Sequence, residues 1–242
     1  MYFDTRYLYI LLAVIAVISI LSGGFSLLGL LLTIPGVLIA ITFHEFAHAF
    51  MAYKLGDDTP KIQGRLNLNP FSHLDPFGVI MLIFAHIGWG KPVEINPNNF
   101  TRKISARTAE ALVALAGPVM NLILAIVFAI IFYALQTFAT SFVFGSEIGS
   151  IIYSMVQYAV IVNIGLGVFN LIPLPPLDGS KILMVFLSYN AKRWFEEHTG
   201  LFYAIFLIIW ITPISTMIID PIISGIAGGI DTVIGGVFHL FI

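Results

Sequence analysis

The 242-residue chain is 59% hydrophobic and only 10% charged, whereas a soluble domain carries about 25% charged residues. With a mean hydropathy of +0.99, this composition excludes an ordinary soluble globule and predicts a single membrane domain over residues 1–242. The net charge of −2 provides no basic field that would attract nucleic acid. The chain has no cysteine, so any transition metal must be held by His, Asp or Glu.

Stretches without charge mark the expected membrane spans. An ionisable group at the bilayer centre costs about 2.5–3.5 kcal/mol, and a spanning helix needs about 20 apolar residues. We expect a first span over residues 8–21, which no signal-peptide cleavage site follows, so that it is retained. A second is expected over residues 33–53, where Glu45 is the only acidic or basic residue apart from histidine.

Residues 54–107 form a polar insert with turn signals such as Asn69-Pro70. Within the insert, residues 77–90 are apolar but too few to span, a length that suits a re-entrant or interfacial element. We expect residues 88–95 to offer a strand edge onto which an unwound peptide can pair. An ordinary surface hairpin explains this segment equally well.

Further spans are expected at 108–137, 150–171 and 201–219, and the glycine-rich tail 221–242 fits either a last span or a re-entrant pair. The predicted fold is an all-α membrane protein, a polytopic bundle of about five or six transmembrane helices with a small membrane-associated β or re-entrant insert. Residues 33–55 and 108–190 are expected to form its catalytic core.

The basic residues predict the orientation. The loops near 22–34, 138–149 and 212–221 carry no Lys or Arg, whereas the insert is rich in both. Threading the spans alternately places all 11 Lys and Arg residues on one side of the membrane. The positive-inside rule then makes that side cytoplasmic, and we expect a multi-pass protein of the cell membrane.

The run His44-Glu45-Phe46-Ala47-His48 carries the predicted chemistry. Residues four apart share a helix face, so both imidazoles can bind one zinc ion, and Glu45 lies beside that face where it can act on a water molecule. The motif fixes only three positions, and chance can produce it. However, three ionisable side chains in an otherwise uncharged span are costly without a function.

Catalytic zinc usually has three protein ligands, so a third is needed. The candidates are His73, Asp75, His86 and Asp178. Asp178 is favoured because it follows a proline-broken segment, and broken backbone at membrane depth must face protein or a polar cavity. An ion pair with Lys181 is the alternative for Asp178. For His73 and His86, hydrogen bonding to water or backbone is favoured over a second metal.

Three motifs occur in order within apolar stretches: HEFAH at 44–48, AGPVMN at 116–121 and FNLIPLPPLDG at 169–179. Over residues 33–190 the chain resembles the site-2 protease family, in particular its small members without a PDZ domain. The resemblance implies one catalytic zinc held by His44, His48 and Asp178, with Glu45 catalytic. It also implies transmembrane proteins as substrates, cleaved within or near their spans in regulated intramembrane proteolysis.

Asn121 and Asn170 match family asparagines near the active site, which implies contact with the substrate or transition state. Hydrogen bonding between helices is an equally good interpretation. In the implied reaction the zinc polarises the carbonyl, Glu45 transfers the proton, and a helical substrate unwinds first. The rival function is a membrane zinc or proton transporter or channel built on the same buried cluster. Transporters commonly show internal repeats, and none is visible here.

Overall fold

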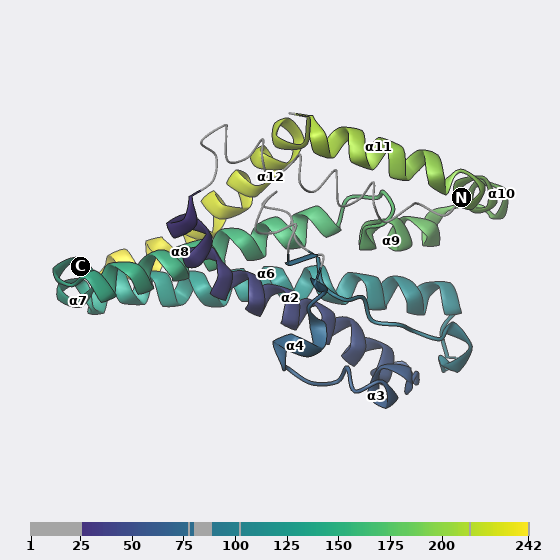
Figure 1. Ribbon diagram of the computed structural model, residues 1–242, viewed down its shortest axis with the longest axis horizontal. Coiled ribbons are helices and arrows are strands. Elements are labelled where there is room, and N and C mark those ends of the chain that lie inside the picture. Colours follow the sequence, from purple (N-terminus) through teal and green to yellow (C-terminus); the bar gives the residue numbers. More distant parts are fainter. Residues whose placement is uncertain (1–25, 77, 80–88, 102, 213, 242) are drawn as a thin grey trace.

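The computed structural model describes residues 26–76, 78–79, 89–101, 103–212 and 214–241. The expected span at 8–21, His86 and most of the expected element at 77–90 lie outside these residues. Three long helices form the centre: α2 (Leu27–Lys54), α6 (Ala106–Phe138) and α8 (Glu147–Asn170). Figure 1 shows α6 and α8 as an antiparallel hairpin closed by α7 (Thr140–Gly145), with α2 crossing it obliquely.

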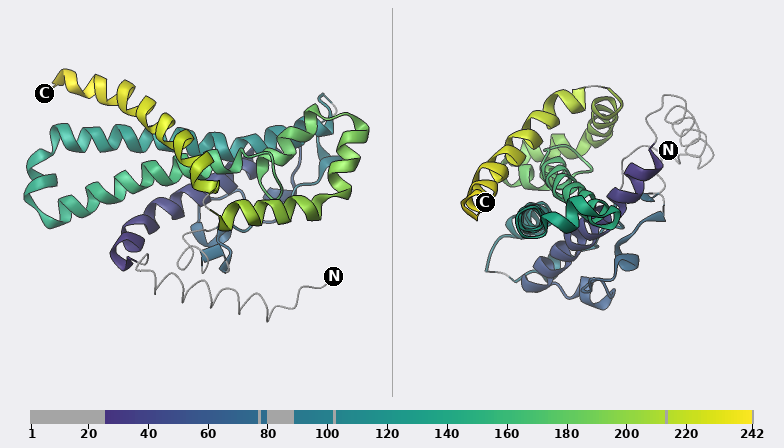
Figure 2. Two further views of the ribbon diagram at one scale, coloured as in Figure 1. Left: turned by 90° about the horizontal axis from the view of Figure 1, so that it is seen from above. Right: turned by 90° about the vertical axis from the view of Figure 1, so that its left-hand side faces the viewer.

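Shorter helices surround this centre. The insert contains α3, α4 and η1, and the C-terminal third contains α9 to α13; in Figure 2 these two groups lie on opposite sides of the α6–α8 hairpin. Their bounds are α3 (Thr59–Ile62), α4 (Pro70–His73), η1 (Pro97–Asn99), α9 (Asp178–Phe186), α10 (Tyr189–Glu197), α11 (Thr199–Ile211), α12 (Ile214–Ile230), the π-helical η2 (Asp231–Gly235), α13 (Gly236–Phe238) and η3 (His239–Phe241).

Each long helix begins at a serine N-cap, where the hydroxyl satisfies an otherwise unbonded backbone N–H. Ser26, Ser105 and Ser146 accept hydrogen bonds from the backbone N–H groups three residues later. These caps start the helices a few residues before the expected spans at 33–53, 108–137 and 150–171. Because charge is excluded from the bilayer, the uncharged stretches located these three spans closely.

Four helical segments among the described residues are long and apolar enough to cross a membrane. They are residues 27–54, 106–138, 147–170 and 216–241. The helical fold class is therefore confirmed, with four candidate spans in the described part against about five or six expected for the whole chain. Side chains on the outer faces, such as Ile123 and Ile130, are nearly half exposed, as expected for lipid-facing positions.

The prediction of one span over 201–219 is wrong. Helix α11 ends at Ile211, and Thr212 is extended at φ −100° and ψ 160°, the conformation that a residue before proline prefers. The last span instead covers 216–241, and Ile219 packs against a buried cluster centred on Ile164. Near the C-terminus, Phe238 and Phe241 contact Phe138 at the end of α6, and the tail forms one continuous candidate span.

The insert contains no strand among its described residues, only an isolated antiparallel bridge between Leu74 and Gly90. Side chains form hydrogen bonds with backbone groups that would otherwise pair with a neighbouring strand. The buried Asp57 carboxylate accepts hydrogen bonds from the Asn96 backbone N–H (2.7 Å) and the Asn99 side chain (2.8 Å). It thereby fastens the end of the extended segment 91–96 to the end of α2.

The pKa of Asp57 is lowered from its ordinary value. Burial on its own raises the pKa of this carboxyl, because it disfavours the charged form. Hydrogen bonds from Thr59, Asn96 and Asn99 to the carboxylate outweigh that effect. Asp57 is therefore a charged anchor inside the insert.

Candidate metal centre

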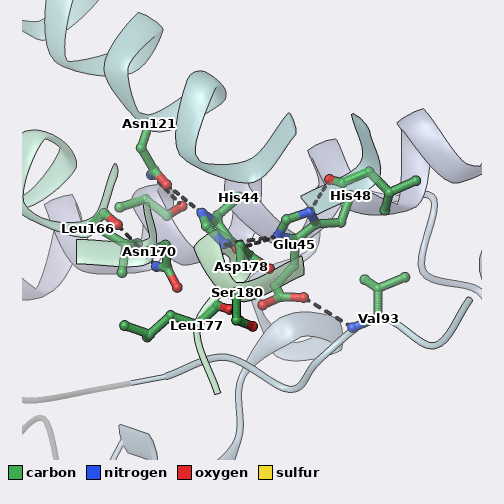
Figure 3. Close-up of polar contacts among 12 residues, drawn as sticks. His44, Glu45, His48, Val93, Asn121, Leu166, Asn170, Leu177, Asp178 and Ser180 are labelled. Atoms are coloured by element: carbon green, nitrogen blue, oxygen red, sulfur yellow. Dashed lines mark hydrogen bonds and ion pairs between the residues drawn. The ribbon is translucent and has the colours of Figure 1, made fainter. Parts of the chain in front are cut away.

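Helices α2 and α9 bring three of the predicted ligands to one point, shown in Figure 3. The Nε2 atoms of His44 and His48 lie 3.0 Å apart, and each lies 3.1 Å from Oδ2 of Asp178. All three residues are buried or nearly so. Their ligand atoms form the one group of its kind in the described part of the chain, all within 4.8 Å of one another.

The outer nitrogens of both rings are held by acceptors. His48 Nδ1 lies 2.6 Å from the Val113 carbonyl oxygen, which can only accept, so Nδ1 carries the proton. His44 Nδ1 lies 2.6 Å from Asn121 Oδ1. The Asn121 amide nitrogen donates to the Ala40 carbonyl at 3.1 Å, which turns its oxygen toward His44. Each neutral ring therefore presents an unprotonated Nε2 to the centre.

When both rings are neutral, three electron-pair donors face one another. Such an arrangement is unfavourable unless a cation lies among them. Two imidazoles and one carboxylate suit a catalytic zinc site, and tetrahedral ligands at about 2.0–2.2 Å from the ion lie about 3.3–3.6 Å from one another. The observed separations of 3.0–3.1 Å are a few tenths of an ångström shorter, so small side-chain shifts make these residues fit a zinc ion.

Asn163 on α8 extends the support of His44 and was missed in the sequence. Its Oδ1 accepts from the Asn121 amide at 3.0 Å, and its own amide donates to the Ala159 carbonyl at 2.8 Å. Both asparagines are fully buried. A lone asparagine in an apolar span is a usable signal for a hydrogen bond between helices, but the sequence does not show that it leads to His44.

The backbone of α6 forms a close wall beside the two rings. A Cβ atom at Gly117 would lie 2.5 Å from Nε2 of His48 and 2.7 Å from Cε1 of His44. Real Cβ atoms essentially never come that close to another heavy atom. The glycine of the AGPVMN motif therefore makes room for the ligands.

Asp178 is delivered by the turn between α8 and α9. Helix α8 ends at Asn170, and Asp178 is the first residue of α9 after an extended Leu177. The turn is tight at Gly179, where a Cβ would lie 2.3 Å from the Leu171 carbonyl oxygen. Among the described residues Asp178 pairs with the two histidines and makes no ion pair with Lys181.

Glu45 lies beside the three ligands, 8% exposed, and its Oε2 accepts a hydrogen bond from the Val93 backbone N–H at 3.2 Å. A cavity of about 150 Å³ opens here between the insert and the core. It is lined by His44, Glu45, His48, Pro92, Val93, Ile95, Val113, Ala114, Asn170, Pro176, Asp178 and Lys181. Glu45 and the ligands therefore share one polar space.

The remaining candidates lie elsewhere or have other contacts. The Asn170 amide donates to the Leu166 carbonyl at 3.0 Å, while the residue lines the cavity. His73 is fully buried and its Nε2 contacts the Asn67 carbonyl at 2.7 Å. Asp75 accepts from the Gly78 backbone at 2.9 Å. Neither His73 nor Asp75 joins the three ligands.

Comparison with known proteins agrees with this geometry. The model of peptidase family M50 matches residues 32–212. YwhC of Bacillus subtilis is 38% identical over 192 residues, covering 78% of this chain and 84% of that protein. Rip2 of Mycolicibacterium smegmatis is 30% identical over 189 residues, covering 76% and 68%. Rip2 of Mycobacterium tuberculosis is 32% identical over 166 residues, covering 67% and 60%.

All three relatives carry the name "Putative zinc metalloprotease", and no solved structure matches the chain significantly. The matched region contains the two histidines, Glu45 and Asp178. The chain belongs to peptidase family M50, the site-2 protease family.

Proposed function

We propose that this chain is an intramembrane zinc endopeptidase that hydrolyses peptide bonds within or near the transmembrane segments of other membrane proteins. The observation that carries the proposal is the meeting of His44, His48 and Asp178 inside a membrane-spanning helix bundle, with Glu45 beside them. A hydrolytic site at this depth suits a substrate that is itself embedded in the bilayer. Family membership supports the metalloprotease chemistry.

In this mechanism His44, His48 and Asp178 would hold one zinc ion. When bound, zinc supplies Lewis-acid activation of the attacking water and the scissile carbonyl. Glu45 takes a proton from that water and delivers it to the amine nitrogen as the C–N bond breaks. The Val93 N–H holds Oε2 of Glu45 and leaves Oε1 to carry the proton.

The two predicted asparagines take different roles in this proposal. Asn121 is fully buried and its amide contacts His44, Ala40 and Asn163, so we assign it to positioning His44. Asn170 lines the cavity, where it can contact the peptide being cleaved. Hydrogen bonding by such an amide suits the transition state of peptide hydrolysis, in which negative charge develops on the carbonyl oxygen.

The proposed partners are transmembrane substrate proteins and the lipid bilayer, with no nucleic acid. A spanning helix shields its carbonyls with its own hydrogen bonds, so the substrate must unwind before it enters the cavity. The insert, rich in Lys and Arg, lines the site cavity with Pro92, Val93 and Ile95, so the insert and the site lie at the same end of the bundle. By the positive-inside rule we place this end on the cytoplasmic side of the cell membrane.

The test uses the purified protein in detergent micelles, with zinc content and cleavage of a reporter transmembrane segment as readouts. Wild type should bind one zinc ion and cleave. Glu45→Gln should keep the zinc and lose cleavage, and Asp178→Asn should lose both. A wild type that binds zinc but never cleaves, with zinc flux retained by Glu45→Gln in vesicles, would instead identify a transporter.

A further inference from the structure

A buried arginine lies on the opposite side of the 91–95 segment from the candidate catalytic site. Arg65 is 6% exposed, and its guanidinium donates hydrogen bonds to the carbonyl oxygens of Ser72, Lys91 and Pro92. Among the described residues no carboxylate lies within ion-pair distance of it. Taking a cation out of water is costly, so its binding to main-chain carbonyls needs an explanation.

One peptide unit connects this arginine to Glu45. The carbonyl of Pro92 accepts from Arg65 at 2.9 Å, and the N–H of the same peptide, on Val93, donates to Glu45 Oε2 at 3.2 Å. The C=O and N–H of a trans peptide point in opposite directions. The peptide dipole therefore lies between a guanidinium at its negative end and a carboxylate at its positive end, an arrangement that strengthens both hydrogen bonds.

The local backbone fixes where Arg65 lies. Helix α3 ends in a Schellman motif: the Gly64 N–H bonds to the Lys61 carbonyl at 3.0 Å and the Arg65 N–H to the Pro60 carbonyl at 2.8 Å. Gly64 has φ +67°, a left-handed conformation that glycine adopts without strain. The motif thus places Arg65 directly after a rigid turn.

The rest of the 91–96 segment is fastened at both ends. The Lys91 N–H donates to the His73 carbonyl at 2.7 Å, and the Asn96 N–H donates to Asp57 at 2.7 Å. Neither contact fixes the rotation of the Pro92–Val93 peptide between them. Arg65 holds this peptide at its carbonyl, and Glu45 holds it at its N–H.

We propose that Arg65 is a positioning residue for peptide hydrolysis: through the Pro92–Val93 peptide it orients the carboxylate of Glu45 toward the attacking water. This inference rests on the proposed function. Without Arg65 the peptide can rotate, the Val93 N–H leaves Oε2, and Glu45 loses its fixed orientation. A misplacement of about 1 Å in a catalytic group can cost about 100-fold in rate.

The experiment measures kcat, KM and zinc content for wild type, Arg65→Ala and Arg65→Lys on the reporter transmembrane segment. Arg193→Ala is the matched control, because Arg193 is exposed and, within the described part of the chain, forms its ion pair with Glu197 one turn away. Arg65→Ala should bind zinc normally and lose about 10- to 100-fold in kcat, with KM within about threefold. Added methylguanidinium should raise kcat of this variant and not of wild type, and Arg65→Lys should recover part of the loss.

Several results would overturn the inference. Arg65→Ala with kcat within twofold of wild type would show that Glu45 does not depend on it. Loss of zinc in both Arg65 variants, with no rescue by methylguanidinium, would show that Arg65 only supports the fold. Absence of cleavage by wild type, or equal cleavage by Glu45→Gln, would instead refute the proposed function.

Discussion

Replacing Gly117 by alanine should weaken zinc binding strongly while it changes the stability of the fold little. The new Cβ would lie 2.5 Å from His48 Nε2 and 2.7 Å from His44 Cε1, so the rings must move about 1 Å to reach ordinary contact distances. Metal–ligand distances tolerate about 0.2 Å, and alanine is favoured over glycine in a helix by about 1 kcal/mol. Overpacking a buried site costs about 1–3 kcal/mol, which that gain offsets in part. We therefore expect a fold of similar or slightly lower stability, with zinc affinity and kcat each lowered about 100-fold.

The assay is zinc competition with a chelator, followed by reporter cleavage and thermal unfolding of the same preparation. Gly228→Ala is the matched control, since a Cβ there has no neighbour within 4 Å. It should leave zinc affinity and cleavage unchanged. Wild-type zinc affinity and cleavage in Gly117→Ala would refute the argument that this glycine makes room for the ligands.

Three further predictions follow from other parts of the structure. Asn163→Ala removes one of the two acceptors that hold the Asn121 amide, which loosens the orientation of His44, and it should lower zinc affinity or kcat about 10- to 100-fold; an unchanged chelator titration would contradict this. Because the pKa of Asp57 is lowered in the folded state, its charged carboxylate stabilises the fold above the unfolded-state pKa of about 3.9, and this contribution is lost as the pH falls through the lower folded-state pKa. In Asp57→Asn, Tm should therefore depend less on pH between pH 6 and 3 than in wild type. A Tm lowered equally at every pH would argue against this linkage. Reporter spans with helix-breaking residues near the cleavage point should be cleaved faster than a rigid Leu/Ala span, and equal rates would count against substrate unwinding.

The sequence predicted the three central spans because the cost of burying charge applies to every residue of a span. Asp178 was identifiable by the same logic: it is an acid after a proline-broken segment at membrane depth. The structure brings it to His44 and His48. The break between α11 and α12 was missed because average hydropathy does not register a single proline at position 213.

The support around the ligands could not be predicted in the same way. Asn163 is 42 residues from Asn121 and 119 from His44, and their alignment depends on how α2, α6 and α8 cross. At the α2–α8 crossing, a Cβ on Gly36 would lie 2.8 Å from the Ala159 Cα. The β edge expected at 88–95 is not confirmed: residues 89–95 form no strand, and Arg65 and Glu45, distant in sequence, bind backbone groups of Lys91, Pro92 and Val93.

The two histidine ligands differ in how their outer nitrogens are held. His44 is oriented by the side chain of Asn121, so point mutations at Asn121 or Asn163 can retune it. His48 is oriented by the main-chain carbonyl of Val113, which no side-chain substitution removes. Side-chain substitutions can therefore change the orientation of His44 in small steps. The orientation of His48 changes only when the backbone of helix α6 moves. Because Val113 and Asn121 both lie on α6, a substrate or lipid that slides α6 along α2 would move the partners of both rings at once.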